Sequence, residues 1–334
     1  MDEHFVIVAS KAETALPRPC DAIVEEHGGR LEGSNGTSRD FVEGIGVCRF
    51  GVPRYDRLPS RVVVYSIIWS LPRAVGEKLS QQLEGLPVWM ANDADAAAFG
   101  EFKAGAGRGS EHMIAITLGT GLGSGIIIHS KLYTGFAYGG AEFGHSLLVK
   151  DGELCTCGRR GCLEAYASAT GLIRMTKRHM ESNRDSMMWK LVDGDLNRVS
   201  GRTAFDAMRQ GDAEGSRVVE IYTECLAEGI VNIVNIFQPE IICIGGGLSK
   251  EGDTLLKPIN RYIEQYAFSR FADKNTVVRI AELGNDAGLI GQRSSRTRSI
   301  AGSKNTNRTK IPSFRACFQK DGIFYGKIFE DVHL

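Results

Sequence analysis

Three cysteines and one histidine lie close together near the middle of the sequence. Cys155, Cys157 and Cys162 fall within a stretch of eight residues, and His145 precedes them. A structural zinc ion takes four nitrogen or sulfur ligands in a tetrahedron, and one imidazole with three thiolates completes such a set. Glycines between the last two cysteines permit the tight turn that brings the thiolates back to one ion. Because protein atoms would fill all four positions, the sequence predicts a structural zinc knuckle.

Other interpretations of this cluster are weaker. Scattered cysteines in a reducing cytosol are usually buried apolar side chains, whereas a tight cluster favours a metal. A zinc ribbon that binds DNA is disfavoured, because the ligands do not form two separated cysteine pairs and no basic stripe accompanies them. His145 has a second ring nitrogen, which could hold a hydroxyl group while the first binds zinc. Glu142 and Glu164 flank the cluster, and their carboxylates could accept further hydroxyl groups of a carbohydrate.

Two glycine-rich stretches follow predicted strands. The first exposes backbone N–H groups that could hold phosphate oxygens, although a plain hairpin is an equal alternative and the lysine of a P-loop is missing. The second would let a flat or charged ligand approach the backbone, and the alternative there is a simple strand-to-helix turn. The candidate ligand contacts in these stretches are Gly119, Thr120, Gly121, Gly123, Gly245, Gly246 and Gly247.

Asn92 and Asp93 stand where a predicted strand meets a predicted helix. Ligand sites in α/β sheets favour that position, and a carboxylate there could accept a proton from an attacking hydroxyl group. Taken alone, the pair favours a plainer interpretation in which Asp93 caps the helix that begins at Ala94.

The elements that must position these groups alternate between strands and helices. Apolar or β-branched runs predict strands at residues 41–48, 62–68, 86–90, 113–118, 126–128 and 240–244. Apolar residues at helical spacing predict helices at 71–83, 94–103 and 218–237. This alternation is typical of an α/β fold with mixed sheets.

The bulk composition is that of a soluble globular protein. The 334 residues suffice for two domains, with 43% hydrophobic and 24% charged residues. Forty basic residues balance forty acidic ones, so no overall field attracts nucleic acid or an anionic membrane. No apolar run is long enough for a membrane span or a signal peptide, which predicts a cytoplasmic protein. Residues 293–310 hold six basic residues and no acidic one, a composition typical of a disordered tail.

Together these motifs resemble the ROK family (repressor, open reading frame, kinase), and within it the bacterial glucokinase-like proteins. The matching segments lie within residues 83–291, and the most specific are Glu142-x-Gly-His145 and the Cys-x-Cys-Gly-x-x-Gly-Cys-x-Glu segment that ends at Glu164. The resemblance implies a two-domain, actin-like ATPase (ribonuclease H-like) α/β fold with a zinc knuckle. It suggests a truncated or degraded N-terminal α/β domain at 1–98, a C-terminal α/β domain with the knuckle at 99–292, and an atypical basic tail at 293–334.

The resemblance further implies an ATP-dependent sugar kinase, a transferase of carbohydrate metabolism and glycolysis that converts a hexose, first of all glucose, to its 6-phosphate. Asp93 would be the general base for the 6-hydroxyl group, and Asn92, Glu142, His145 and Glu164 would hold the other hydroxyl groups. The turn at 119–123 would face the ATP phosphates, residues 245–247 would face the adenosine, and Mg²⁺ would arrive with ATP. The implied partners are the hexose, ATP and further copies of the chain in a homodimer or homotetramer, with no nucleic acid and no membrane.

The sequence departs from the family pattern near both ends. An Asp-x-Gly-Gly phosphate loop is missing near the N-terminus, and the basic tail replaces an apolar closing helix. A frameshift at both ends would explain these departures, and so would a protein that binds a sugar without catalysis. The alternative to a kinase is therefore a catalytically impaired sugar-binding protein or sensor. A repressor is disfavoured, because residues 1–40 are too short and irregular for a winged-helix domain.

Overall fold

The computed structural model describes residues 45–49, 88–136, 139–288, 290–291, 314–320 and 323–328. The chain divides into two units, of which the first comprises residues 1–103 with 285–334 and the second comprises residues 104–284. The described elements confirm the predicted α/β class with a mixed sheet. The predicted domain boundaries at 98/99 and 292/293 stay predictions.

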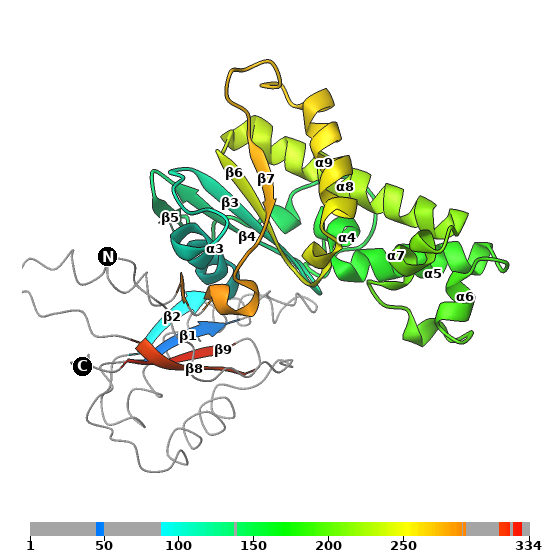
Figure 1. Cartoon of the computed structure of the whole chain (residues 1–334), viewed down its shortest axis with the longest axis horizontal. Coiled ribbons are helices and arrows are strands. Elements are labelled where there is room, and N and C mark those ends of the chain that lie inside the picture. The colour runs from blue at the N-terminus through cyan, green and yellow to red at the C-terminus, as the bar shows by residue number, and fades with distance from the viewer. Residues whose placement is uncertain are drawn as a thin grey trace, which may run out of the picture. The chain divides into compact units, whose positions relative to one another are not determined.

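A five-stranded sheet forms the centre of the second unit, and its order is β5-β4-β3-β6-β7 (Figure 1). Strand β3 pairs antiparallel with β4 and parallel with β6, while β6 pairs parallel with β7. The sheet is therefore mixed, and the parallel strands β3 and β6 end at the same edge. The strands are β3 (Met113–Leu118), β4 (Leu122–Ile128), β5 (Lys131–Tyr133), β6 (Ile241–Gly246) and β7 (Val277–Ile280).

Strand β4 corrects the predicted glycine turn. The sequence predicted a strand only from residue 126, with the glycine-rich stretch before it as a turn, but the ladder with β3 continues to the Leu118–Leu122 pair. Gly123 and Gly125 therefore lie inside the strand, where they pair with Thr117 and Ala115. Glycine is a weak strand former, so its presence suggested a turn, whereas pairing to β3 decides the outcome.

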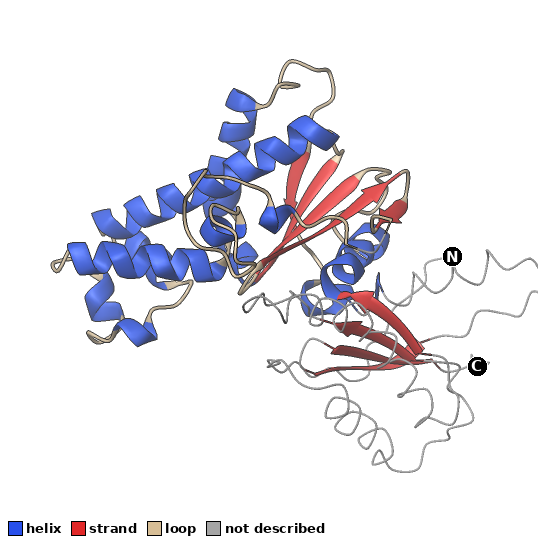
Figure 2. Cartoon of the chain, turned by 180° about the vertical axis from the view of Figure 1, so that it is seen from behind, coloured by secondary structure: helices blue, strands red, loops and turns tan. Residues whose placement is uncertain are grey.

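Helices of the second unit are gathered beside the sheet (Figure 2). The long helix α8 begins at Ala213, five residues before the predicted start, because the Asp212 side chain accepts a hydrogen bond from the Gly215 N–H at 2.6 Å. The helices are α4 (Glu164–Ala167), α5 (Ala169–Ser182), α6 (Met188–Leu191), α7 (Thr203–Arg209), α8 (Ala213–Phe237) and α9 (Asp253–Tyr266), with short 3₁₀ turns η2 (Phe143–His145), η3 (Leu196–Arg198) and η4 (Gly247–Glu251). The 3₁₀ turn η5 (Gly284–Asp286) includes the last residue of this unit and the first residues of the segment 285–334.

One apolar core joins β3 and β6 to α8. Leu163, between two predicted site residues, is 2% exposed. A Cβ atom at Gly229 of α8 would lie 2.5 Å from the Leu163 side chain, so the glycine allows this close packing. The buried Tyr222 hydroxyl donates to the Ala167 carbonyl oxygen at 2.9 Å. The segment that carries Cys162 and Glu164 is thus fixed to the core.

The first unit contains β1 (Ile45–Arg49), which pairs in parallel with β2 (Val88–Asn92), and α3 (Asp93–Ala104), which follows β2 directly. These elements confirm the helix predicted at 94–103 and the described parts of the strands predicted at 41–48 and 86–90, whose residues 41–44 and 86–87 lie outside the described residues. Strands β8 (Phe314–Lys320) and β9 (Ile323–Ile328) form an antiparallel hairpin in the same unit.

Other predicted elements fall outside the described residues, namely the strand at 62–68, the helix at 71–83 and the basic stretch at 293–310. Among the described helices, none combines the length and the apolar character that crossing a bilayer requires.

Candidate functional site

The predicted zinc ligands lie on a loop that backbone hydrogen bonds fold into a knuckle. The Cys155 N–H donates to the Arg159 carbonyl at 2.9 Å, and the Gly161 N–H donates to the Glu153 carbonyl at 2.8 Å. Gly161 has a φ angle of 83°, and a Cβ atom there would overlap the Val149 carbonyl oxygen. Glycine is therefore required at the position where the sequence predicted a tight turn.

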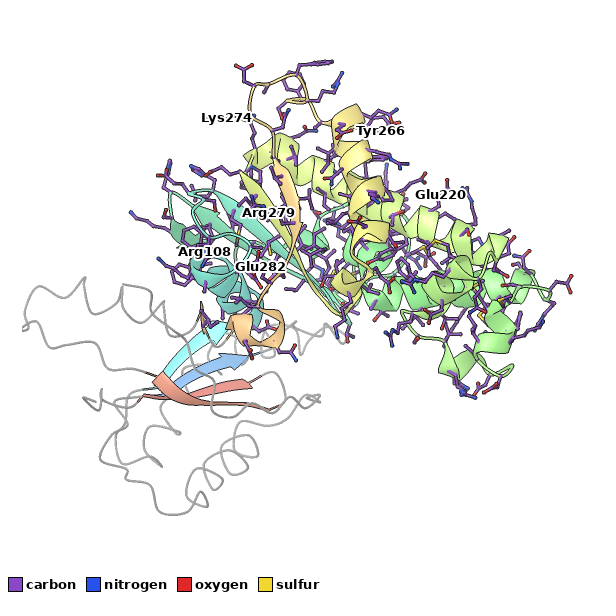
Figure 3. The ribbon with its side chains drawn as sticks, viewed as in Figure 1. Arg108, Glu220, Tyr266, Lys274, Arg279 and Glu282 are labelled. Atoms are coloured by element: carbon purple, nitrogen blue, oxygen red, sulfur yellow. The ribbon has the colours of Figure 1, made fainter. Side chains whose placement is uncertain are left out.

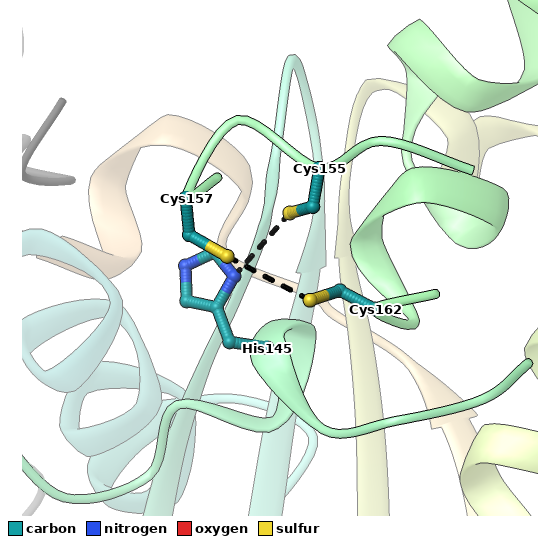
Figure 4. A group of neighbouring side chains, drawn as sticks. All are labelled: His145, Cys155, Cys157 and Cys162. Atoms are coloured by element: carbon teal, nitrogen blue, oxygen red, sulfur yellow. Dashed lines mark hydrogen bonds between the residues drawn. The ribbon is translucent and has the colours of Figure 1, made fainter. Parts of the chain in front are cut away.

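The four predicted ligand atoms converge (Figure 4). Cys155 Sγ lies 3.6 Å from His145 Nδ1, Cys157 Sγ lies 3.7 Å from Cys162 Sγ, and all four atoms lie within 4.8 Å of one another. Zn–S bonds of about 2.3 Å and Zn–N bonds of about 2.0 Å in a tetrahedron separate two sulfurs by roughly 3.8 Å and a sulfur from a nitrogen by roughly 3.5 Å. The two short distances match edges of this tetrahedron, so the residues fit a zinc ion.

The Cys162 thiol of the knuckle is hard to ionise on its own. Burial, with hydrogen bonds and charges of Cys157 and Cys155, raises the pKa of the Cys162 thiol to about 12. Zinc binds thiolates, and the charge of a bound cation reverses this preference. The crowding that disfavours a free Cys162 thiolate thus belongs to a compact set of ligands for a divalent cation.

Glu164 connects the knuckle to the glycine turn of the β3–β4 hairpin. The side chain is buried at the start of α4. Its Oε1 accepts hydrogen bonds from the Thr156 hydroxyl at 2.6 Å and the Cys155 thiol at 3.4 Å, and its Oε2 accepts the Leu122 N–H at 3.0 Å. A Cβ atom at Gly121 would lie 2.5 Å from Oε2. The carboxylate therefore holds the knuckle and the turn together.

Glu142 lies beside this group, at the start of η2. The pKa of the Glu142 carboxyl is raised, mainly by desolvation. The charge of the nearby His145 acts to lower this pKa, and that of the nearby Glu164 acts to raise it. Part of the Glu142 surface remains exposed. Cys155 Sγ contacts both His145 Nδ1 and Glu164 Oε1. The structure thus brings together three of the residues that the sequence predicted to hold sugar hydroxyl groups.

The two glycine stretches meet at one edge of the sheet. Leu118 at the end of β3 pairs with Gly246 at the end of β6, so the turn at 119–121 lies beside residues 246–247. A Cβ atom at Gly119 or Gly247 would meet no atom of the described residues within 4 Å, so among them there is room for a ligand to approach the backbone. Gly246 has a φ angle of 87°, and only glycine fits there beside Leu118.

Hydrogen bonds fix this turn to the start of α5. The Ala169 N–H donates to the Gly119 carbonyl at 2.9 Å, and the Thr170 hydroxyl donates to the Thr120 carbonyl at 2.7 Å. Two of the predicted ligand contacts, Gly123 and Gly245, lie within strands on either side of Thr117 rather than in the turns.

Asn92 rather than Asp93 caps helix α3. The Asn92 Oδ1 atom accepts hydrogen bonds from the Ala94 N–H at 2.8 Å and the Asp95 N–H at 3.1 Å. The interpretation of Asp93 as the cap is therefore wrong, because Asp93 is already the first residue of the helix. Asn92 and Asp93 belong to the first unit, whereas Glu142, the knuckle and the glycine turns belong to the second.

Sequence reasoning missed Thr156 and the Leu122 N–H, which both bind Glu164. The position of Thr156 between two predicted zinc ligands was a usable signal. The backbone donor at Leu122 had no signal in the sequence, because every residue except proline carries the same N–H group.

Comparison with known proteins decides the family. The sequence pattern that defines the ROK family matches residues 36–295, which is more than half of the chain. The chain belongs to the ROK family. This confirms the resemblance found in the sequence motifs.

Several relatives of this ROK protein are glucokinases. It is 38% identical over 265 residues to a glucokinase of Halalkalibacterium halodurans, and the aligned region covers 78% of each chain. It is 35% identical over 286 residues to a glucokinase of Streptomyces coelicolor, and the aligned region covers 85% of this chain and 89% of the relative. Among solved structures, a ROK family glucokinase from Streptomyces griseus in complex with glucose and AMPPNP matches with 38% identity and a TM-score of 0.61, over 66% of this chain and 71% of the other.

Proposed function

We propose that this ROK protein is an ATP-dependent hexose kinase that phosphorylates glucose on its 6-hydroxyl group. The glucokinase relatives bear out the enzyme class predicted from the sequence, an ATP-dependent sugar kinase. The observation that carries the proposal is the group of Glu142, His145 and Glu164 next to the knuckle, together with the glycine-lined edge of the sheet. A hexose presents several hydroxyl groups, and a set of acceptors and donors of this kind suits it.

The knuckle would shape the sugar site. His145 Nδ1 faces Cys155 Sγ, so zinc bound there would leave Nε2 for a hydroxyl group and fix the orientation of the ring. A Cys155 thiolate on zinc donates no proton, and Oε1 of Glu164 would then regain an acceptor position. Zinc, coordinated by His145, Cys155, Cys157 and Cys162, would supply structural support.

Asp93 is the proposed general base. Asn92 takes the capping role, and Asp93 lies half-buried in the first turn of α3. In the proposed reaction its carboxylate accepts the proton of the 6-hydroxyl group while that oxygen attacks the γ-phosphorus atom and ADP leaves. Mg²⁺ would arrive with ATP and neutralise phosphate charge. The glycine edge at 119–121 and 246–247 would face the nucleotide.

One specific observation favours a second candidate, a sugar-binding protein without catalysis. The N-terminal segment lacks the Asp-x-Gly-Gly loop of the family pattern, and phosphoryl transfer depends mostly on positioning and electrostatic stabilisation. A cytoplasmic location and a homodimeric or homotetrameric state stay predictions of both candidates.

A coupled assay of ADP release, run beside calorimetric titration with glucose, separates the two candidates. We expect glucose-dependent ADP release that falls by about 10²- to 10⁴-fold in Asp93→Asn, the usual contribution of a general base. Asp95→Asn is the matched control, since Asp95 lies in the same first turn of α3, and it should keep the parent rate. Glucose binding without ADP release in the parent would reject the kinase, and the absence of both would reject both candidates.

A further inference from the structure

A second group of side chains of the types that ligate metals lies at the other end of β3. Glu111 and His112 precede the strand, and His129 lies in the turn between β4 and β5. One donor atom from each of the three side chains lies within 4.8 Å of the others. The two imidazole rings are 4.6 Å apart between centroids at an angle of 71°. Strand β3 separates this group from the glycine turn by about 23 Å, since His112 and Gly119 are seven residues apart at roughly 3.3 Å per residue.

The backbone under this group is fixed without using its side chains. The Glu240 carboxylate accepts the Glu111 N–H at 2.7 Å and the His112 N–H at 2.9 Å. The Glu240 N–H donates to the His112 carbonyl at 2.9 Å, and the Ser130 N–H donates to the Glu111 carbonyl at 2.8 Å. The start of β3 and the β4–β5 turn are therefore held together before any ion binds, which lowers the entropic cost of binding.

His129 occupies a backbone conformation that favours glycine or asparagine. His129 and Ser130 have φ angles of 49° and 59°, as in the two-residue hairpin turns for which Asn-Gly is the preferred pair. A glycine would fit this position with less strain, but only the histidine places an imidazole next to His112. Strained positions of this kind are a recurrent feature of ligand sites.

The chemistry of the three side chains points to one class of ligand. Two imidazoles and a carboxylate suit late first-row divalent cations, and three protein ligands leave coordination positions for water. Glu111 and His129 are exposed, so rotation of their side chains can bring the donor atoms to the roughly 3.4 Å spacing of a tetrahedral zinc site. The Glu240 carboxylate adds a negative charge nearby, while Lys274, in the loop between α9 and β7 (Figure 3), adds a positive one.

We propose that Glu111, His112 and His129 form a binding site for a late first-row divalent cation such as Zn²⁺. This site differs from the knuckle in its ligands, since it contains no sulfur, and in its place in the fold. It does not depend on the proposed kinase activity.

The test is a calorimetric titration of Zn²⁺ into the 334-residue chain, free of an affinity tag and already carrying one equivalent of zinc. We expect one further equivalent to bind. His129→Asn should weaken this binding at least roughly 10- to 100-fold, because even the loss of an outer hydrogen-bond partner of a metal ligand costs that much. Asparagine tolerates a positive φ angle, so the turn should persist, and an unchanged circular dichroism spectrum with unchanged tightly bound zinc would show that it does.

Glu111→Gln provides a second variant that leaves the turn sequence intact and should also weaken binding. His179→Ala is the matched control, because His179 contacts a single carboxylate, that of Glu214 at 3.0 Å, and its loss should leave the second equivalent unchanged. The proposal is overturned if the parent binds no second equivalent, if both site variants bind like the parent, or if His179→Ala loses as much affinity as they do.

Discussion

The contact between Gly121 and Glu164 makes a quantitative prediction for two alanine substitutions in one turn. In Gly121→Ala the new Cβ atom would lie 2.5 Å from Glu164 Oε2, which is too close for non-bonded atoms, so the carboxylate must move. That movement breaks its hydrogen bond with the Leu122 N–H. In Gly119→Ala the new Cβ atom would meet no atom within 4 Å in the part of the chain that the structure describes.

The expected magnitudes follow from these contacts. A hydrogen bond to a charged group contributes about 1.5–3 kcal/mol, while a strain-free change from glycine to alanine stabilises a protein by about 0.4–1 kcal/mol through the unfolded chain. Gly121→Ala should therefore lower the free energy of unfolding by about 1–2 kcal/mol. Gly119→Ala should leave it unchanged or raise it by up to about 1 kcal/mol.

Urea unfolding followed by circular dichroism measures both values, and steady-state kinetics adds a second readout. Gly121→Ala moves the carboxylate of the proposed sugar site, so the KM for glucose should rise more than the KM for ATP. Gly119→Ala fills the space beside the proposed phosphate site, so the KM for ATP should rise more. Equal stability of the two variants would refute the structural reasoning, and identical changes in the two KM values would refute the assignment of the ligands.

Three further predictions concern the knuckle, the pH dependence of stability and the core. Metal analysis should find about one tightly bound zinc per chain. Cys157→Ser should lose this zinc, whereas Cys225→Ser, on α8, should keep it. A parent protein that is fully folded without metal would contradict the zinc site. Hydrogen bonds from the backbone N–H groups of residues 111 and 112 lower the pKa of Glu240 from its ordinary value of 4.5. The ionised carboxylate therefore stabilises the fold above that value and loses its effect as the pH falls through the lower pKa of the folded state. Urea midpoints of the parent and Glu240→Gln should accordingly differ at pH 7 and converge as the pH falls below the lowered pKa of the folded state, and a constant difference would contradict this. Tyr222→Phe removes a donor to a buried carbonyl and should lower the free energy of unfolding in urea by about 1–3 kcal/mol. Tyr266→Phe, at an exposed position, should have little effect on it. A similar loss of stability in both variants would argue against the buried hydrogen bond.

The sequence predicts best those features that short stretches of chain determine by themselves. The apolar run at 113–118 and the helical spacing at 218–237 define β3 and most of α8 because burial of one face requires those periodicities. The cluster of predicted zinc ligands is equally visible, because a group of closely spaced cysteines is chemically distinctive and local.

Features that depend on a partner far along the chain are harder to predict. The start of β4 at Leu122 depends on its pairing with β3, which overrides the poor strand preference of Gly123. Asn92 and Asp93 are both good capping residues, and only the extended backbone at the end of β2 selects Asn92. The environment of Glu164 rests on the Leu122 N–H, a main-chain donor 42 positions away that has no side-chain signature.

The bond between Glu164 and Leu122 also has a thermodynamic consequence. In the proposed arrangement, the carboxylate that holds a sugar hydroxyl group is tied to the turn that faces the nucleotide. A ligand that orders either group reduces the conformational freedom that the other ligand must still remove. The affinities should then be linked: the factor by which bound glucose tightens ATP binding must equal the factor by which bound ATP tightens glucose binding. One buried hydrogen bond would thus make the two substrates cooperative within a single unit of the chain.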